Sequence, residues 1–326
     1  MRVSSQTLKA ALGAAALCAI APFASAQAAY PAKPVRIVVP YPPGGAVDQV
    51  TRRVAQKLTE QTGQSFFVEN KAGATGTIGA QQVAKAAPDG YTLMANDTTY
   101  SILPHVFNKL PFDPERDLVP VAAFNFAPMA LVVGSDSRFK TLSELIGFAK
   151  ANPGKLNYGT GGAGTTPHFS TEALASAAKI EVTHVPFKGA GEATLALLSG
   201  TIDFQIASTP GVMGQAKGGK VRLLGISGDK RLAALPEVPT FKEAGIKDYS
   251  VINFTGLWAP KGTPAAVIQR LQKEIAAAMA SPEVQKFSTD LGAVPSVLSG
   301  DAFARMLRDN THLWSAVAAA AKVEKQ

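Results

Sequence analysis

The chain has 326 residues, a formal net charge of +8 and a single cysteine, and 46% of its residues are hydrophobic. One cysteine excludes a small disulfide scaffold and a multi-cysteine zinc site, so an ordinary hydrophobic core must stabilise the fold. The basic residues are scattered and not interleaved with aromatics, which argues against nucleic acid as a partner. The mild positive field that remains suits an anionic ligand.

The first 26 residues have the pattern of a secretory signal peptide. Arg2 and Lys9 give a cationic start, a short apolar run follows, and small residues at Ala24–Ala26 form a cleavage pattern. The apolar run is too short to span a bilayer. Removal of residues 1–26 takes away the only cysteine and lowers the net charge to +6. We therefore expect an exported product with no thiol chemistry.

From residue 35 to residue 226, apolar runs of strand length alternate with helical patterns. A helix is predicted from Val47 to Leu58, ended by Gly63, and another opens at the capping box Thr141–Glu144. The predicted strands are Val35–Val39, Phe66–Val68, Tyr91–Ala95, Met129–Val133, Leu156–Tyr158, Val182–Phe187, Ile202–Ala207 and Val221–Ile226. This alternation predicts parallel βαβ units in open α/β sheets.

The last third of the chain is mainly helical. Thr263 as N-cap and Pro264 at the first helical position predict a long amphipathic helix, and two more helices follow. The whole chain is too long for one small sheet, so we expect two α/β lobes. The strand-like "MALVV" and "VINFTGLWAP" are the predicted crossings between them. They place the first lobe at residues 27–127 plus 251–326 and the second at 128–250.

Loops at the carboxyl ends of the strands are where open α/β sheets bind ligands. These loops are rich in Gly, Thr, Ser, Asn and Pro, and Asp48 and Asp97 are their acids. Glycines expose backbone amides, hydroxyls donate, and each helix start adds partial positive charge, which together predict an anion site without a metal. The loops are 40–48, 70–77, 96–101, 159–170, 186–191 and 207–211.

The first of these loops, "PYPPGGAVD", combines two prolines with two glycines. Pro42 and Pro43 stiffen the turn, so less conformational entropy is lost when a ligand binds. Gly44 and Gly45 are expected to expose amides just before the helix that begins near Asp48. The loop therefore reads as a preformed half of an anion clamp.

Other chemistries fit the sequence less well. "GTGGAG" at 159–164 matches a dinucleotide-binding pattern, but no acidic residue ends the next strand to bind the ribose hydroxyls. His168 stands on the first turn of a predicted helix, where it either contacts a ligand or packs against the helix start. As a general base it would need a nucleophile and an orienting acid. An exported hydrolase using Ser208 and His168 is the weakest alternative.

A family resemblance runs through the whole chain after the signal peptide. It is carried by "YPAKPVRIVVPYPPGGAVD", "VENKAGATGTIGAQQVAKAAPDGYTL", "LNYGTGGAGTTPHFSTEAL" and "HVPFKGAGEATLALLSGTIDF" in this order. The sequence resembles the Bug family, the periplasmic solute receptors of tripartite tricarboxylate transporters. The resemblance implies a periplasmic, non-enzymatic, two-lobe binding protein of type II that closes around a small organic carboxylate. It also implies delivery to membrane permease subunits, and we expect a monomer without cofactor or metal.

The resemblance also implies where the ligand lies. The family's aromatic-x-x-G-G-x-x-D loop corresponds to 41–48, its second-lobe glycine loop to 161–168, and its Val-Pro-aromatic-Lys-Gly turn to 185–189. With the other loops above, the predicted ligand-binding residues are Tyr41, Pro42, Gly44, Gly45, Asp48, Ala72, Thr75, Asp97, Gly161, Ala163, Thr165, Thr166, His168, Phe187, Lys188, Gly189, Ala207 and Ser208.

The sequence leaves alternatives for the roles of Lys188 and Asp97 and for the role of the receptor as a whole. Lys188 either pairs with a carboxylate or is solvated. Asp97 departs from the family pattern, and if it points inward it disfavours a second carboxylate and favours an amine or hydroxyl on the ligand. A receptor that presents its carboxylate ligand to a signalling partner would have the same pocket as a transport receptor.

Overall fold

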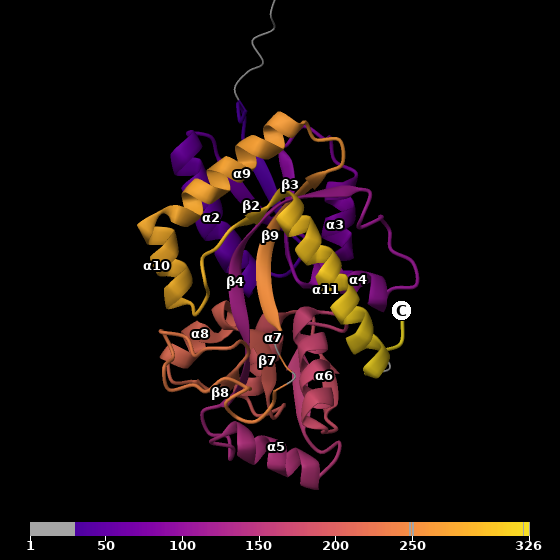
Figure 1. Ribbon diagram of the computed structural model, residues 1–326, viewed down its shortest axis with the longest axis vertical. Coiled ribbons are helices and arrows are strands. Elements are labelled where there is room, and N and C mark those ends of the chain that lie inside the picture. The colour runs from indigo at the N-terminus through magenta and orange to yellow at the C-terminus, as the bar shows by residue number, and fades with distance from the viewer. Residues whose placement is uncertain (1–29, 248, 250, 322, 326) are drawn as a thin grey trace, which may run out of the picture.

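The computed structural model describes residues 30–247, 249, 251–321 and 323–325, so the predicted signal peptide lies outside the described residues. Two α/β lobes are stacked along the long axis of the molecule, and two long strands run from one to the other (Figure 1). The fold is the expected two-lobe α/β architecture.

The element bounds follow the alternation of the sequence. The strands are β1 Val35–Val39, β2 Phe66–Asn70, β3 Thr92–Asp97, β4 Leu118–Gly134, β5 Asn157–Thr160, β6 Thr183–Pro186, β7 Gln205–Ser208, β8 Val221–Ile226, β9 Ile252–Pro260 and β10 Leu298–Ser299. The helices are α2 Ala46–Thr62, the 3-10 turn η1 Ala74–Gly76, α3 Thr77–Ala84, α4 Thr99–Val106, α5 Leu142–Ala151, α6 Thr166–Ala178, α7 Ala190–Leu198, α8 Thr209–Lys217, α9 Ala265–Ala280, α10 Pro282–Asp290 and α11 Gly300–Ala320.

The sheet of the first lobe has the strand order β10-β4-β9-β3-β1-β2. Strands β1, β2 and β3 are parallel, as the alternation predicts, whereas β9 and β4 are antiparallel to their neighbours. Strand β1 is apolar except at Arg36, because helices cover both of its faces. Ile37 and Val39 pack in a core with α2 and α9, while Val38 packs with α3 on the other side.

Strand β4 is shared by both lobes, so the two sheets are continuous. Residues 118–128 pair with β9, and residues 129–134 pair with β7 and β8. The apolar run predicted at 129–133 is thus only the second-lobe half of a longer strand. The proposed lobe limit between 127 and 128 lies next to this exchange of partners.

The second lobe contains the remaining strands and helices α5 to α8. The capping box that opens α5 is confirmed, since Thr141 Oγ1 accepts a hydrogen bond from the Glu144 amide and the Glu144 carboxylate accepts one from the Thr141 amide. Strand β7 begins at Gln205, later than the predicted Ile202. Strands β5 and β6 form a short parallel pair beside it.

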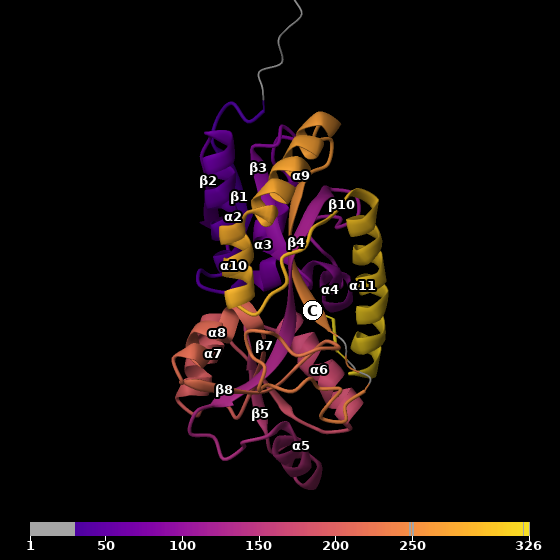
Figure 2. The same cartoon turned by 60° about the vertical axis from the view of Figure 1, so that its left-hand side comes forward.

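The C-terminal helices differ in one detail from the prediction. Helix α9 takes Pro264 as its N-cap, because the hydroxyl of Thr263 donates instead to the carbonyl of Pro260 at 2.7 Å. Helix α11 extends along one side of the molecule to α6 in the second lobe (Figure 2). There Trp314 is buried and packs edge-on against Phe169, with ring centroids 6.0 Å apart. Both lobes therefore pack against the C-terminal helix.

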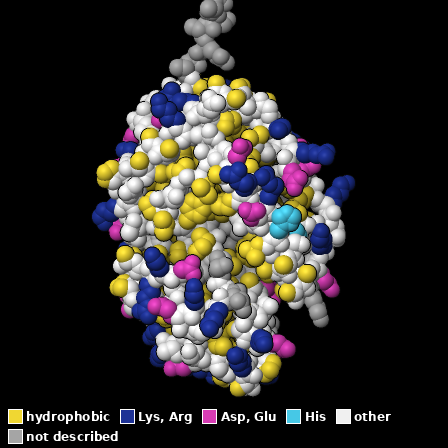
Figure 3. Space-filling view, viewed as in Figure 1, with side chains coloured by type: hydrophobic (Ala, Val, Ile, Leu, Met, Phe, Trp, Pro, Cys, Tyr) yellow, Lys and Arg dark blue, Asp and Glu magenta, His cyan; other side chains and the backbone are white. Residues whose placement is uncertain are grey.

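Basic and acidic side chains are interspersed on the surface, and several of them form ion pairs. On the face in Figure 3, Lys and Arg side chains are dispersed with acidic side chains among them. None of the helices in the described part of the chain has the length and apolar character needed to cross a bilayer.

Candidate functional site

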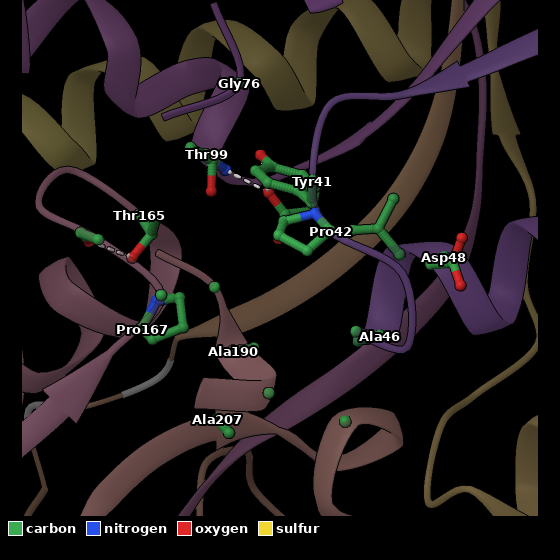
Figure 4. A pocket seen from close by; sticks show the side chains of 18 of the residues that line it. Tyr41, Pro42, Ala46, Asp48, Gly76, Thr99, Thr165, Pro167, Ala190 and Ala207 are labelled. Carbon is green, nitrogen blue, oxygen red and sulfur yellow. Dashed lines mark hydrogen bonds between the residues drawn. The ribbon is translucent and has the colours of Figure 1, made fainter. Parts of the chain in front are cut away.

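A cavity of about 630 Å³ lies between the lobes, at the carboxyl ends of the strands. Its walls come from the loops after β1, β3, β5, β6 and β7, together with the η1 turn. Figure 4 shows Tyr41 and Pro42 of the first lobe on one side and Thr165, Pro167, Ala190 and Ala207 of the second on the other. The glycine-rich loops that the sequence singled out thus meet at one place.

Five helices have an N-cap residue that lines this cavity. The N-cap residues that line it are Gly45 of α2, Gly76 of α3, Thr165 of α6, Gly189 of α7 and Ser208 of α8. None of these five residues accepts a side-chain hydrogen bond from its own helix. Such bonds are also missing at α4 and at α9 to α11, so these five helices are distinguished by N-cap residues that line one cavity. First-turn amides lack intrahelical acceptors and carry partial positive charge, which favours an anion.

The loop after β1 places the first of these helix starts. Gly44 has a φ of +88°, a conformation that glycine adopts without strain. Its amide donates to the Asp48 carboxylate at 2.9 Å, so this amide is not available to a ligand, in contrast to the expectation from the sequence. Gly45, Ala46 and Val47 do line the cavity. A Cβ on Gly189 of the second lobe would lie 2.8 Å from Pro42, so glycine is needed where these loops meet.

Asp48 is held by its own loop and helix. Its carboxylate accepts hydrogen bonds from Arg52 Nε at 3.0 and 3.1 Å, Asn70 Nδ2 at 2.9 Å and the Gly44 amide. Burial raises the pKa of Asp48, but these donors and the charge of Arg52 lower it below its ordinary value on balance. Asp48 lies apart from the other labelled side chains, on the first turn of α2 (Figure 4). Its charge is therefore compensated within the protein and stabilises the loop.

Asp97 ends β3 and also lines the cavity, with 8% of its surface exposed. Its Oδ1 accepts a hydrogen bond from the Thr99 amide at 2.9 Å, and the Tyr41 hydroxyl lies 3.3 Å away. Asn253 Nδ2 lies 3.4 Å from Oδ2. Burial raises the pKa of Asp97, although these hydrogen bonds oppose the shift. Asp97 is thus a buried acid at the cavity wall with weak compensation.

The glycine loop of the second lobe closes the opposite wall. A Cβ on Gly161 would lie 2.8 Å from the Ala190 amide nitrogen, so glycine allows the β5–α6 and β6–α7 loops to touch. Gly162 and Gly164 have φ values of +129° and +77°. Glycine is accommodated there without strain, and backbone groups form much of this wall.

His168 lies behind this loop and does not line the cavity. Its Nδ1 accepts a hydrogen bond from the Gly164 amide at 3.1 Å, and its ring stacks on His184 with centroids 4.2 Å apart. Burial lowers the pKa of His168 to about 3 and that of His184 to about 4. Both rings are therefore neutral at pH 7, and His168 has the helix-start packing role that was one of its two interpretations.

Hydrogen bonds join the lobes across the cavity. Thr75 Oγ1 donates to the carbonyl of Ala163 at 2.9 Å, although Thr75 has a φ of +54°, an unfavourable conformation for a β-branched residue. The hydroxyls of Thr99 and Thr166 lie 2.9 Å apart, and the Thr166 amide donates to Thr99 Oγ1 at 3.1 Å. These contacts hold the two walls together in this conformation.

Most of the residues predicted from the sequence line the cavity: Tyr41, Pro42, Gly45, Asp48, Ala72, Thr75, Asp97, Gly161, Thr165, Phe187, Lys188, Gly189, Ala207 and Ser208. Four predicted residues are adjacent to it without lining it: Gly44, Ala163, Thr166 and His168. Each of these four instead makes a hydrogen bond that fixes a wall. The side chain of Lys188 is exposed at the cavity edge, and its amide donates to the Glu192 carboxylate.

Other lining residues were not predicted from the sequence. They include Thr99, Met129, Pro167, Glu192, Gln205 and Asn253. Asn253 had one usable signal, because it is a polar residue within the apolar strand "VINFTGLWAP". Among the described residues, no group of three or more His, Cys, Asp or Glu side chains could hold a metal ion.

The fold and this cavity define the protein as a two-lobe solute-binding receptor. The model of the TctC family, described as the tripartite tricarboxylate transporter family receptor, matches residues 50–322. The chain belongs to this family, which confirms the resemblance. Its members are periplasmic solute-binding receptors and not enzymes.

Curated relatives and solved structures agree with this assignment. A Pseudomonas sp. (strain P51) protein, the UPF0065 protein in the tcbD-tcbE intergenic region, is 38% identical, with 88% of this chain and 85% of the relative covered. Protein BugT of Bordetella pertussis is 32% identical, with 88% and 89% covered.

Two similar structures contain carboxylate ligands. Rpa4515 of R. palustris with adipate has a TM-score of 0.88 at 30% identity, covering 91% of this chain and all of that one. MatC from Rhodopseudomonas palustris with bound malate has a TM-score of 0.81 at 31% identity, covering 88% and 99%.

Proposed function

We propose that this receptor captures a small organic carboxylate in the interlobe cavity and delivers it to the membrane subunits of a tripartite tricarboxylate-type transporter. The observation that carries the proposal is the convergence of five helix starts on one cavity. Amides at helix starts bind carboxylates without a metal or a formal positive charge. The adipate and malate bound to the two similar structures belong to the same ligand class.

The proposal includes a cycle of capture and release. The Thr75–Ala163 and Thr99–Thr166 hydrogen bonds join the lobes, and β4 and β9 connect them as continuous strands. A ligand between the walls adds contacts to both lobes and so favours the closed conformation. We propose that the mature chain, residues 27–326, performs this cycle in the periplasm after the signal peptide is removed.

A thermal-shift screen of carboxylic acids on the mature chain tests the proposal. A ligand at a hundred times its dissociation constant adds about 2.7 kcal/mol to the unfolding free energy, which gives a clear rise in melting temperature. The matched controls are the amides of the same acids, which lack the negative charge. If no carboxylate raises the melting temperature more than its amide does, the proposal is wrong.

The partnership with the transporter needs its own measurement. In cells that carry the transporter's membrane subunits, deletion of this receptor should abolish uptake of the acid found in the screen, and the restored gene should recover it. Uptake that continues unchanged without the receptor would contradict the delivery step while leaving carboxylate binding intact.

A further inference from the structure

Asp97 is a buried carboxylate that the protein satisfies only in part. Among the hydrogen bonds that Asp97 accepts from the described residues, the shortest comes from the Thr99 amide, at 2.9 Å from Oδ1. The Tyr41 hydroxyl has a single proton to donate, and its oxygen lies closer to Asn96 Oδ1, at 2.6 Å, than to Asp97 Oδ1, at 3.3 Å. The other oxygen, Oδ2, has only the long contact of 3.4 Å from Asn253. A carboxylate accepts about four hydrogen bonds, so Asp97 retains acceptor capacity.

No cation compensates this charge from within the described residues. Their ion pairs include one at Asp48, with Arg52 at 3.0 Å, and none at Asp97. Lys188, which also lines the cavity, is exposed on the second lobe. Burial of an uncompensated acid is costly, and the side chain is more than nine-tenths buried. Because Asp97 lines the cavity, the missing partner can come from a ligand.

We propose that Asp97 determines ligand specificity by accepting a hydrogen bond from an ammonium or hydroxyl group that the ligand carries in addition to its carboxylate. This inference rests on the proposed function and names the substrate class of that same site. The ligand carboxylate binds at the helix starts, and the donor group of the ligand binds at Asp97. A second carboxylate at this position is disfavoured, since it would face a like charge in a desolvated site.

The proposal can be tested with series of acids that share one carbon skeleton and differ only in the added donor group. Succinate, malate and aspartate form one series, and 3-phenylpropionate, 3-phenyllactate and phenylalanine form a larger one for a cavity of this size. Within each series the first acid has no added donor, the second has a hydroxyl and the third has an ammonium group. Affinities are measured by isothermal titration calorimetry on the full mature chain.

The expected result has two parts. In at least one series, the wild type binds a donor-bearing acid at least tenfold more tightly than the acid without the donor. Asp97→Asn then weakens the donor-bearing acid by tenfold or more and changes the other by less than threefold. The tighter of the second and third members identifies the donor as hydroxyl or ammonium.

The controls separate specificity from folding. Asp89→Asn makes the same chemical change at an exposed position that pairs with Lys33, so its affinities should match the wild type. Asp97→Ser serves as a second variant if Asp97→Asn does not fold, and it should show the same selective loss. Near-UV circular dichroism confirms the fold of each variant.

Three outcomes overturn the inference. Equal affinities within each series, or an equal loss of affinity for all members in Asp97→Asn, would show that Asp97 does not recognise the donor group. The proposed carboxylate binding would still stand. Preference for the donor-free acid in both series would show that the site rejects the added donor and that Asp97 does not bind it. If no acid of either series binds, the inference fails together with the proposed function.

Discussion

Asp48 and Asp97 line the same cavity from the same lobe, yet their surroundings give them different roles. Both are buried, with 4% and 8% of their surfaces exposed. Asp48 has Arg52, Asn70 and the Gly44 amide as close donors. Among the described residues, Asp97 has the Thr99 amide at 2.9 Å as its shortest donor and no ion pair. Burial raises the pKa in both cases, and only at Asp48 do the donors reverse the shift. The two acids therefore differ in the donors and cations that neutralise their charge, and not in burial or position. Asp48 is neutralised within the protein and has a structural role, whereas Asp97 can still bind a donor group of a ligand.

The same neutralising change at the two acids should give the largest difference in stability. Asp48→Asn removes the ion pair with Arg52 and leaves one close donor without an acceptor. We expect it to lower the free energy of unfolding by about 1–3 kcal/mol. Asp97→Asn can keep the Thr99 hydrogen bond through its amide oxygen and removes an uncompensated charge. Its stability should stay the same or rise by up to about 1 kcal/mol.

Urea unfolding at pH 7 without ligand measures this difference, with the midpoint and the slope compared among the wild type and both variants. Equal destabilisation by the two substitutions would contradict the contrast between the acids.

The pH dependence of stability should differ in sign between the two acids. Asp48 has a lowered pKa in the folded state, so its contribution is present above the unfolded pKa and is lost as the pH falls through the folded pKa. Asp97 has a raised pKa, so the folded state loses stability as the pH rises from the unfolded pKa through the folded pKa. The groups around Asp97 are Tyr41, Asn96, Thr99 and Asn253, and burial keeps the pKa of Tyr41 well above its usual range.

Urea midpoints between pH 3 and pH 8 test this. Asp48→Asn should fall below the wild type at neutral pH and approach it in acid. Asp97→Asn should equal or exceed the wild type at neutral pH, with the gain shrinking in acid. Curves that stay parallel to the wild type would show that neither acid changes its pKa on folding.

Substitution of Thr75 should have a smaller effect on ligand affinity, and this effect should be the same for all ligands. Thr75→Val removes the hydroxyl that donates to Ala163 across the cavity but keeps the branched shape. Since one such hydrogen bond contributes about 0.5–1.5 kcal/mol, every bound acid should weaken by a common factor of about 2–10. Titration calorimetry with the same acids measures it, and Thr75→Ser, which keeps the hydroxyl, should lose less. A selective loss would mean that Thr75 contacts the ligand instead of supporting closure.

The sequence by itself determined the architecture and the composition of the site. Alternation of apolar strands and helical patterns gave the α/β class, and the positions of the strand ends located the glycine-rich loops. These signals are local, since a strand, its turn and the next helix start are read from neighbouring residues. The recurring lack of acids in those loops pointed to an anion, and the capping box at Thr141 appeared where expected.

Only the tertiary structure decided what each side chain does at the cavity. Asp48 accepts a hydrogen bond from Asn70 of β2, and Asp97 accepts a long one from Asn253 of β9. Thr75 donates a hydrogen bond to the carbonyl of Ala163 in the other lobe. The partners of Asp97 and Thr75 lie 156 and 88 residues away along the chain. Periodicity indicates which face of an element is buried, but it carries no information about such distant donors. The charge state and availability of a buried carboxylate depend on those donors, because a low-dielectric site amplifies every hydrogen bond that is made or missing.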